Sequence, residues 1–342
     1  MIWLTWRQFR AQAIVAGAAL VAVAIALVST GPHLVSLFDS NGLATCRTSC
    51  GTDAGNFINQ IKGSTTELVF YGGIFLVYAV PALIGLFWGA PLVTRELESG
   101  TFRLAWNQSV TRSRWIAVKL GLTGLAAMAT AGLLSLMISW WASPLYQAAL
   151  KSGGNGLSIN KLAPPLFDAT GIAPVGYAAF GFALGVTAGV VIRRTVPAMA
   201  VTLAIFAAIQ IFWPVVVRPH LIPAVHGTEP LSAVTFNGMG ETNNGQLILT
   251  IGSISGQAGD WVTSGRVVDA AGRAATHVPA SCTQSNSPSS FIHCLAGRGV
   301  RMAVTYQPAS RYWAFQWLET GVFLILAAGL GALCYWRVRR LT

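Results

Sequence analysis

Few residues in this sequence have the types and spacing that catalysis needs. None of the four lysines follows a glycine, so the Gly-Lys-Ser/Thr core of a P-loop is absent and no phosphate site for ATP is recognisable. The run Gly-Ser-Ile-Ser-Gly places Ile254 where a nucleophile elbow needs serine, and no His-Glu-x-x-His zinc motif occurs. We therefore predict that the chain is not an enzyme and that it holds no catalytic residue, metal or cofactor of its own.

The cysteines are the next candidates for chemistry. Four of the five form two pairs that are close in sequence, Cys46 with Cys50 and Cys282 with Cys294. Four cysteines allow three connectivities, and we favour disulfides within these two local pairs. A metal site at Cys-x3-Cys is the rival for the first pair, but that pair lacks two nearby His or Cys ligands. Cys334 stands in an apolar run and is expected to remain unpaired.

Glu319 is the single charged residue within the apolar run 312–336. An ionisable group inside a membrane span is costly to bury and by default marks a functional site. The alternative is that its side chain reaches the nearby interface between membrane and water, as long polar side chains do. Both interpretations of Glu319 are open from the sequence.

The composition requires that most of the chain avoid water. Of the 342 residues, 54% are hydrophobic and only 10% charged, and the mean hydropathy is +0.58. Soluble domains carry about 25% charged residues. A membrane helix needs about 20 apolar residues. Six runs meet that need: 11–38 (centred on 13–28), 68–94, 121–141, 169–192, 195–217 and 312–336. We predict an all-α polytopic membrane protein with six transmembrane helices.

The first apolar run has a small-residue pattern around Ile25 that resembles a signal-peptidase site. The pattern lies inside the apolar run rather than after it. We therefore expect an uncleaved membrane anchor, which leaves the orientation of the later helices unchanged.

The net charge of +11 taken alone indicates nucleic-acid binding. Its distribution indicates a membrane protein instead. With the N-terminus inside, the short cytoplasmic segments carry a net charge of +10, and the longer exterior segments carry only +2. This is the positive-inside pattern, so we predict that both termini are cytoplasmic, that the basic residues face lipid, and that no nucleic acid binds. The four paired cysteines then lie on the oxidising side, where disulfides form.

The spans divide the chain into regions of different character. An amphipathic helix is expected in the membrane interface before the first span, because apolar and aromatic residues such as Trp3 and Trp6 stand there beside Arg7 and Arg10. A domain rich in strands and loops is expected outside the membrane, because the runs 246–251, 261–268 and 301–306 have strand character between polar turns. The predicted regions are an interfacial helix 1–12, helices 1–5 within 13–217 with exterior loops 29–67 and 142–170, a cytoplasmic loop 95–115, an exterior domain 218–311, and the sixth helix with a basic tail 312–342.

Glycines repeat every four residues in the fourth span, at Gly181, Gly185 and Gly189. Such a stripe lets another helix approach closely. The sequence leaves open whether that helix belongs to the same subunit or to another one.

The cytoplasmic loop 95–115 mixes charged and apolar residues. Gly100 is placed to end the helix of the second span, and Thr101 is placed to cap a short turn that contains Phe102. Three apolar residues within one short turn fit a rigid, exposed knob better than a solvated connector.

In this loop the sequence resembles permease subunits of the type-2 ATP-binding-cassette (ABC) exporter family. The matching residues are Arg95-Glu96 through Gly100-Thr101, followed by Arg112, Trp115 and Lys119. The number and order of the spans extend the resemblance over the whole chain. Segments 3–10, 87–91, 193–194 and 306–313 are more narrowly similar to a group of actinobacterial permeases. Val110 departs from the family, because many members have proline there.

The resemblance implies a transport subunit in a bacterial plasma membrane that another chain drives. The working unit would contain two permeases, as a homo- or heterodimer, and two cytoplasmic ABC ATPase subunits that bind ATP and Mg. ATP-driven closure of the ATPases would switch the permeases between inward-open and outward-open states. The coupling residues in the loop would be Arg95, Glu96, Glu98, Gly100, Thr101, Phe102, Arg112 and Arg114.

In related exporters the second and fifth spans line the central path. Carried over to this sequence, the path would be aromatic and suited to a hydrophobic or amphipathic substrate. Ordinary helix packing is the alternative for aromatic residues at this spacing. The candidate path residues are Phe75, Tyr78, Phe206, Gln210 and Phe212, with Glu319 in the sixth span.

The main hypothesis is thus the permease subunit of an ATP-driven exporter. The rival from another class is a membrane sensor or scaffold whose exterior domain, 218–311, binds a ligand or partner without transport. Deletion of that domain separates the two, because a sensor would lose ligand binding without a transport defect.

Overall fold

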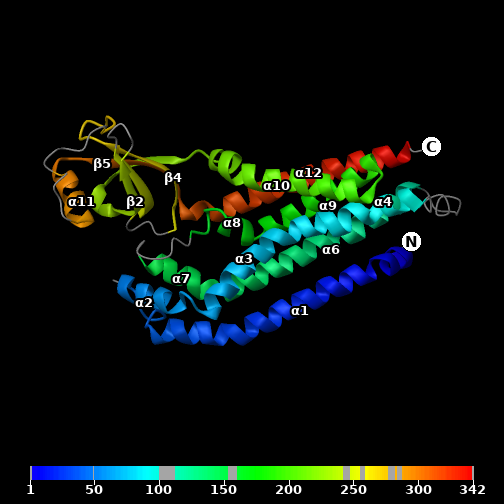
Figure 1. Cartoon of the computed structure of the whole chain (residues 1–342), viewed down its shortest axis with the longest axis horizontal. Helices are drawn as coiled ribbons and strands as arrows, with labels where there is room; N and C mark the ends of the chain where they lie inside the picture. Colours follow the sequence, from blue (N-terminus) through cyan, green and yellow to red (C-terminus); the bar gives the residue numbers. More distant parts are fainter. Residues whose placement is uncertain are drawn as a thin grey trace.

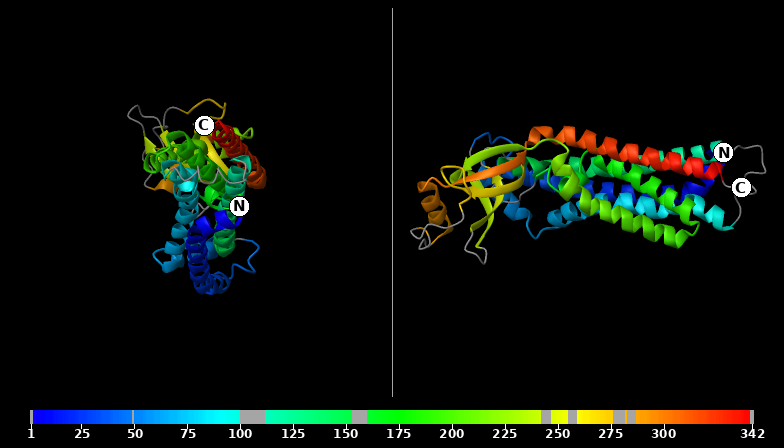
Figure 2. Two further views of the ribbon diagram at one scale, coloured as in Figure 1. Left: turned by 90° about the vertical axis from the view of Figure 1, so that its right-hand side faces the viewer. Right: turned by 90° about the horizontal axis from the view of Figure 1, so that it is seen from above.

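The computed structural model describes residues 2–48, 50–99, 112–152, 160–241, 247–254, 259–275, 282 and 287–340. It consists of a bundle of long helices with a small β domain at one end (Figures 1 and 2). Both chain termini lie at the opposite end of the bundle. These ends are termed the sheet end and the terminal end below.

Six stretches of the described residues are long and apolar enough to cross a membrane, so the predicted six-helix fold is confirmed. Two of the spans contain a π-helical turn between regular segments. The spans are formed by α1 (Ile2–Ser40), by α3 (Thr65–Ile84) with η1 (Gly85–Gly89) and α4 (Ala90–Ser99), by α6 (Arg112–Trp141), by α9 (Ala173–Ile192), by α10 (Thr195–Phe212) with η2 (Trp213–Val217) and η3 (Arg218–His220), and by α12 (Tyr312–Arg339).

Helix α1 is continuous from Ile2 to Ser40, so the prediction of a separate helix over residues 1–12 is wrong. No proline precedes Pro32 in this stretch, and nothing therefore interrupts the backbone hydrogen bonds near the start of the helix. Phe9 is buried and packs edge-on against Trp88, with ring centroids 4.8 Å apart. One side of this N-terminal stretch thus packs on the bundle instead of lying only in the interface.

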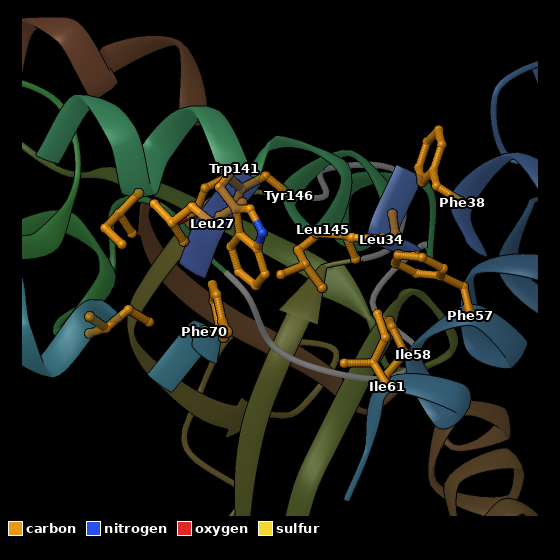
Figure 3. Packing of buried hydrophobic residues seen from close by; sticks show 14 of the residues in the cluster. Leu27, Leu34, Phe38, Phe57, Ile58, Ile61, Phe70, Trp141, Leu145 and Tyr146 are labelled. Atoms are coloured by element: carbon orange, nitrogen blue, oxygen red, sulfur yellow. The ribbon is translucent and has the colours of Figure 1, made fainter. Parts of the chain in front are cut away.

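Short helices cover the sheet end of the bundle. Helix α2 (Gly51–Ile61) and helix α7 (Ser143–Lys151) pack with the ends of α1 and α3 around a shared apolar core. Figure 3 shows Leu34, Phe57 and Leu145 directed into this core from three different helices. The two loops that were predicted as exterior, 29–67 and 142–170, therefore contain helices that pack on each other.

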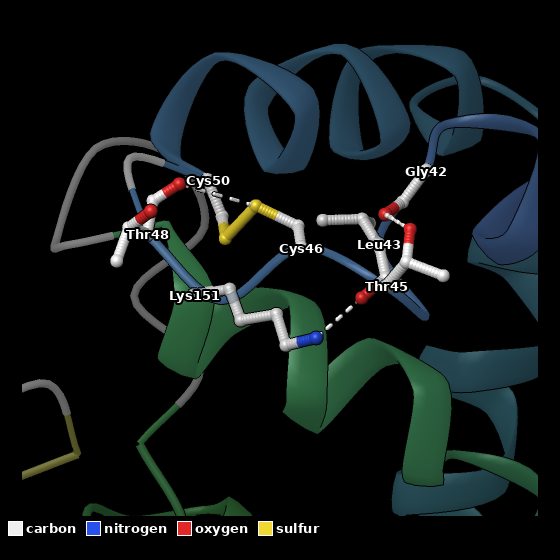
Figure 4. Close-up of a disulfide and its surroundings, with 7 residues drawn as sticks. All are labelled: Gly42, Leu43, Thr45, Cys46, Thr48, Cys50 and Lys151. Atoms are coloured by element: carbon white, nitrogen blue, oxygen red, sulfur yellow. Dashed lines mark hydrogen bonds between the residues drawn. A yellow bond between two sulfur atoms is a disulfide. The ribbon is translucent and has the colours of Figure 1, made fainter.

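Both predicted cysteine pairs are disulfides in the structure. Cys46 is joined to Cys50 just before α2 (Figure 4), and Cys282 is joined to Cys294 in α11 (Pro288–Gly297). Lys151 of α7 donates a hydrogen bond to the carbonyl oxygen of Leu43 beside the first disulfide. Cys334 is free and buried.

The β domain contains two antiparallel arrangements. Strands β1 (Val225–Pro230), β5 (Arg301–Gln307) and β4 (Trp261–Val268) form one sheet in that order, and β2 (Val234–Glu241) pairs with β3 (Leu247–Ile254). The runs predicted as strands overlap β3, β4 and β5, whereas β1, β2 and α11 were not predicted. Asp260 connects the domain to the bundle, because its carbonyl oxygen accepts from Asn160 Nδ2 at 2.6 Å and its carboxylate accepts from the Ala309 amide at 2.8 Å.

Helix α9 is the centre of the bundle. It packs against α3, η1, α4, α6, α10 and α12, and from Ala173 to Val190 only Val175 is not buried. A Cβ atom on Gly181 would lie 2.6 Å from the Pro81 carbonyl oxygen, and one on Gly185 would collide with the backbone of Gly85. The glycine stripe therefore packs within the subunit, onto the long helix formed by α3, η1 and α4.

This packing predicts that Gly185→Ala destabilises the bundle by about 1–3 kcal/mol, since the added methyl group forces two backbones apart. The midpoint of thermal unfolding in detergent micelles measures the effect. Gly329→Ala in α12 is the matched control, because nothing lies within 4 Å of a Cβ atom there. A similar change in both variants would contradict the assigned packing.

Candidate functional site

At the terminal end, an ion pair fastens the end of α4 to the start of α6. Glu96 accepts a hydrogen bond from Lys119, and their side chains are only 17% and 3% exposed. The Lys119 ammonium nitrogen also lies 4.7 Å from the centre of the Trp115 ring. The two helices on either side of the predicted coupling loop are thus joined by a shielded charge pair.

Glu98 connects the same end of α4 to α10. Its carboxylate accepts from the Thr195 amide at 2.9 Å and from the Thr195 hydroxyl at 2.6 Å, which satisfies a backbone donor in the first turn of α10. These hydrogen bonds, that of the hydroxyl foremost, lower the pKa of Glu98. A displacement of α4 would therefore act on α6 through Glu96 and on α10 through Glu98.

The structure describes the other predicted coupling residues only in part. Arg95 and Arg114 are exposed at the terminal end. Gly100, Thr101 and Phe102 lie outside the described residues, and for Arg112 only the backbone is described, at the start of α6. Docking of this loop on an ATPase stays a prediction.

The structure brings together only part of the predicted substrate path. Tyr78 of α3 donates a hydrogen bond to the carbonyl oxygen of Gln210 in α10 at 3.2 Å. Gln210 is buried, and its amide nitrogen has no hydrogen-bond partner among the described residues. Phe206 is buried and stacks on Phe180, whereas Phe75 and Phe212 are 73% and 57% exposed. A hydrogen bond joins Tyr78 to Gln210, Tyr78 also lies beside the Asp168 and Glu319 carboxylates, and the two exposed rings lie on the outer surface of this chain.

A buried charge cluster at the sheet end is the most unusual feature of the bundle. Arg218 of η3 lies between Glu319 of α12 and Asp168 of α8 (Leu166–Ala169), and all three side chains are completely shielded from solvent. Arg218 Nε is 2.9 Å and Nη2 is 2.8 Å from the Glu319 carboxylate, and Nη2 also donates to Asp168. The Tyr177 hydroxyl of α9 donates to Asp168 at 2.6 Å. The cluster therefore joins the adjacent helices α8 and α9 to η3 and α12, which are distant from them in sequence.

Neighbouring polar groups hold these elements in place. Gln316 of α12 accepts from the amides of Ile172 and Ala173 at 2.9 and 2.8 Å, at the start of α9, and donates to the Thr170 carbonyl at 3.0 Å. The Phe167 ring lies 4.2 Å from the Arg218 guanidinium carbon. The turn between α8 and α9 is thus fastened to α12 by Gln316 beside the cluster.

The cluster contains one guanidinium and two carboxylates. If both carboxylates were ionised, a buried site would carry a net negative charge, which is costly in a low-dielectric interior. Burial, together with the charge of Glu319, raises the pKa of Asp168, although Arg218 opposes the shift. The arrangement favours a proton on Asp168 and acts as a rigid clamp.

Sequence reasoning identified only one member of this cluster. Glu319 was singled out, and its complete burial shows that the alternative of reaching the interface is wrong. Asp168 and Arg218 were read only as the charges that bound the fourth and fifth spans, and Tyr177 was not considered. The usable signal was that a carboxylate inside a span needs an opposite charge, and Arg218 stands at the end of a neighbouring span.

Among the described residues, no group of three or more His, Cys, Asp or Glu is placed to hold a metal ion. The model of a family described as ABC-2 membrane transporter related matches residues 17–218. No curated protein and no solved structure matches the chain.

The cluster predicts that Arg218→Met lowers the free energy of unfolding by about 3–5 kcal/mol, because the buried Glu319 carboxylate loses its counter-charge and Asp168 loses a hydrogen-bond donor. The control is Arg273→Met, which breaks a largely exposed ion pair with Asp269 and should cost about 0–1 kcal/mol. Thermal unfolding of both variants in the same detergent gives the comparison. Equal losses would mean that the cluster contributes no more than a surface pair.

The raised pKa of Asp168 also predicts a pH dependence with a definite sign. A group whose pKa is raised by folding stabilises the folded state below its unfolded pKa, about 3.9 for aspartate, and that contribution is lost as the pH rises through the folded value. As the pH rises from about 4 to the folded pKa of Asp168, the thermal midpoint of the wild type should therefore decrease. Asp168→Asn should reduce the slope of the thermal midpoint against pH. The control is Asp39→Asn at an exposed position, which should leave the slope of the thermal midpoint against pH unchanged. A slope that survives in Asp168→Asn would assign the titration to another group.

Proposed function

We propose, from the premise that this chain belongs to the ABC-2 membrane transporter related family, that it is the permease subunit of an exporter driven by a separate ATPase. The family makes it a multi-pass membrane transport subunit. The sequence contains no P-loop, so the energy for transport would come from a partner chain that binds ATP and Mg. Two permeases and two ATPases would form the working unit, with the second permease either identical or different.

The observation that carries this proposal is the double connection of α4. Glu96 is tied to α6 by Lys119, and Glu98 is tied to α10 by Thr195. A partner that pushes the segment between α4 and α6 would therefore move three spans together. This is what coupling to an ATPase requires, because small shifts at one end must be amplified into a change between discrete packings of the helices.

The orientation follows from the charges in this proposal. Among the described residues, the basic side chains of the short loops at the terminal end include Arg95, Arg114 and Arg194. By the positive-inside rule, that end would face the cytoplasm of a bacterial cell and the β domain would face outward. Both disulfides lie on the side that would be oxidising, which supports the same orientation.

The proposed substrate is hydrophobic or amphipathic. Helices α3 and α10 meet at Tyr78 and Gln210, which offer hydroxyl and amide groups within an apolar surface. The exposed rings of Phe75 and Phe212 belong to the same two helices and would face the second permease. An aromatic surface with few polar groups is the usual lining of a site for such ligands.

A charge exchange tests the coupling. Glu96→Lys should lower the ATPase activity that depends on the permease about tenfold, because it places two like charges at the end of α4. The double variant Glu96→Lys with Lys119→Glu should recover most of this activity, because it restores the pair with its charges reversed. The measurement is vanadate-sensitive ATP hydrolysis by the co-expressed complex in lipid nanodiscs.

Asp39→Lys, an exposed change at the sheet end, is the control and should leave ATP hydrolysis unchanged. Normal hydrolysis in Glu96→Lys would contradict a coupling role for Glu96. Failure of the exchange to restore activity, with normal folding, would mean that Glu96 touches the ATPase rather than acting through Lys119.

A further inference from the structure

The sheet formed by β1, β5 and β4 has one buried face and one open face. On β5, Met302 and Val304 point into the core of the β domain and are almost completely buried. Side chains alternate along a strand, so Ala303 and Thr305 point away from that core. Both are half-buried rather than covered. The open face is therefore made by these residues of β5 and by their partners on β1 and β4.

The strand register arranges the open face in two rows, because directly opposite residues of antiparallel strands lie on the same face. From β1 through β5 to β4, the first row is His226, Thr305 and Ser264, and the second row is Thr228, Ala303 and Arg266. The His226 Nδ1 atom lies 3.1 Å from the Thr305 hydroxyl, which ties the first row together. Ala303 has only a methyl group, so the open face is hollowed in the middle of the second row.

The two rows surround a hollow of about 670 Å³. Small-molecule sites have volumes of roughly 300–1,000 Å³. Gly272, in the turn that follows β4, lines one side of the hollow. That turn is fixed by the Asp269 carboxylate, which accepts from the amides of Ala271 and Arg273 at 2.9 and 2.8 Å. The hollow is thus bordered by an ordered turn as well as by the sheet.

The hollow carries a positive charge that is available to a ligand. Arg266 is exposed and lines the hollow, and within the described part of the chain its guanidinium has neither an ion pair nor a hydrogen bond. The Asp269 carboxylate at the border is already paired with Arg273. Glu229 of β1 belongs to the other face of the sheet by the same register. The hollow is therefore suited to an anion, and a guanidinium can make two parallel hydrogen bonds to a phosphate.

The remaining groups in the hollow fit a ligand with hydroxyl groups. None of the described phenylalanine, tyrosine or tryptophan side chains lines it, so a ring has no surface for stacking and binding must depend on charge and hydrogen bonds. The groups that can donate or accept hydrogen bonds are the hydroxyls of Thr228, Ser264 and Thr305 and the ring of His226. Such groups complement the hydroxyls of a sugar.

We propose that this hollow binds a small phosphorylated sugar, with the phosphate at Arg266 and the sugar hydroxyls along the first row. The site lies in the β domain, whereas the proposed substrate path lies in the bundle at Tyr78 and Gln210. The inference therefore goes beyond the proposed function and does not depend on which substrate is transported. With the β domain facing outward, as proposed, the ligand would come from outside the cell.

The test is binding of radiolabelled glucose 6-phosphate to the full-length chain in detergent micelles, measured by equilibrium dialysis. Glucose and glucuronate are the competitors, because they keep the sugar ring and carry a hydroxyl or a carboxylate in place of the phosphate. Glucose should compete about tenfold more weakly than unlabelled glucose 6-phosphate, since it makes no charged hydrogen bond to Arg266. Glucuronate should also compete more weakly than glucose 6-phosphate.

Two variants test the assigned contacts. Arg266→Gln should weaken binding of glucose 6-phosphate about tenfold, as expected for the loss of a charged hydrogen-bond donor. Ala303→Leu should also weaken it, because the larger side chain fills the hollow while Arg266 is kept. Arg301→Gln is the matched control, since Arg301 is exposed in the next row of the same face but does not line the hollow. It removes the same charge and should change the affinity less than about twofold, because solvent screens exposed charges.

Circular dichroism and gel filtration confirm that each variant is folded. Equal losses in Arg266→Gln and Arg301→Gln would overturn the proposal in favour of a general attraction of anions to a basic surface. Absence of saturable binding by the wild type, or competition by glucose or glucuronate as strong as that by glucose 6-phosphate, would also overturn it. The measurement involves neither an ATPase nor transport, so its failure would leave the proposed function unaffected.

Discussion

Backbone contact between α9 and the long helix formed by α3, η1 and α4 is the constraint on which the rest of the structure depends. At the crossing, Gly85 and Gly181 allow an approach in which a Cβ atom on either one would lie 2.6 Å from a carbonyl oxygen of the other helix. In a membrane, where burial of apolar surface drives helix association only weakly, such close packing is a main source of stability. Helix α9 can therefore be buried on nearly all sides, and the other spans are arranged around it.

Different kinds of interaction fix the bundle at the two ends of α9. At the sheet end, Tyr177 belongs to a fully buried set of charges that ties α8, α9, η3 and α12 together. At the terminal end, α4 is tied to its neighbours by Glu96 and by the exposed Glu98, where water and salt weaken the electrostatic contribution. A rigid sheet end and a more adjustable terminal end would suit the proposed subunit, in which the driving force acts on the terminal end.

The elements that the sequence predicted are those with local signals. The spans follow from long stretches without charge, and β4 follows from a strand pattern over residues 261–268. The pairing of Cys46 with Cys50 follows from their separation of four residues. Helix α1 was divided wrongly because tryptophan and arginine near the N-terminus resemble an interfacial helix, and only the contact of Phe9 with the bundle distinguishes the two cases.

The charge cluster could not be assembled from such signals. Arg218 is 50 residues from Asp168 and 101 residues from Glu319 in sequence, and no periodic pattern links residues at those separations. The sequence shows that Glu319 needs a counter-charge inside the membrane span. It does not identify that counter-charge, because the position of Arg218 depends on how four elements pack together.

The central claim is that this permease works with a separate ATPase. The most direct measurement is purification of the tagged chain from its native membranes in mild detergent, with determination of the co-purifying chains, their stoichiometry and the ATP hydrolysis of the complex. The account predicts an ABC ATPase subunit in equimolar amount, two copies of each chain, and hydrolysis that vanadate inhibits. A preparation that contains no ATPase chain and hydrolyses no ATP would contradict it.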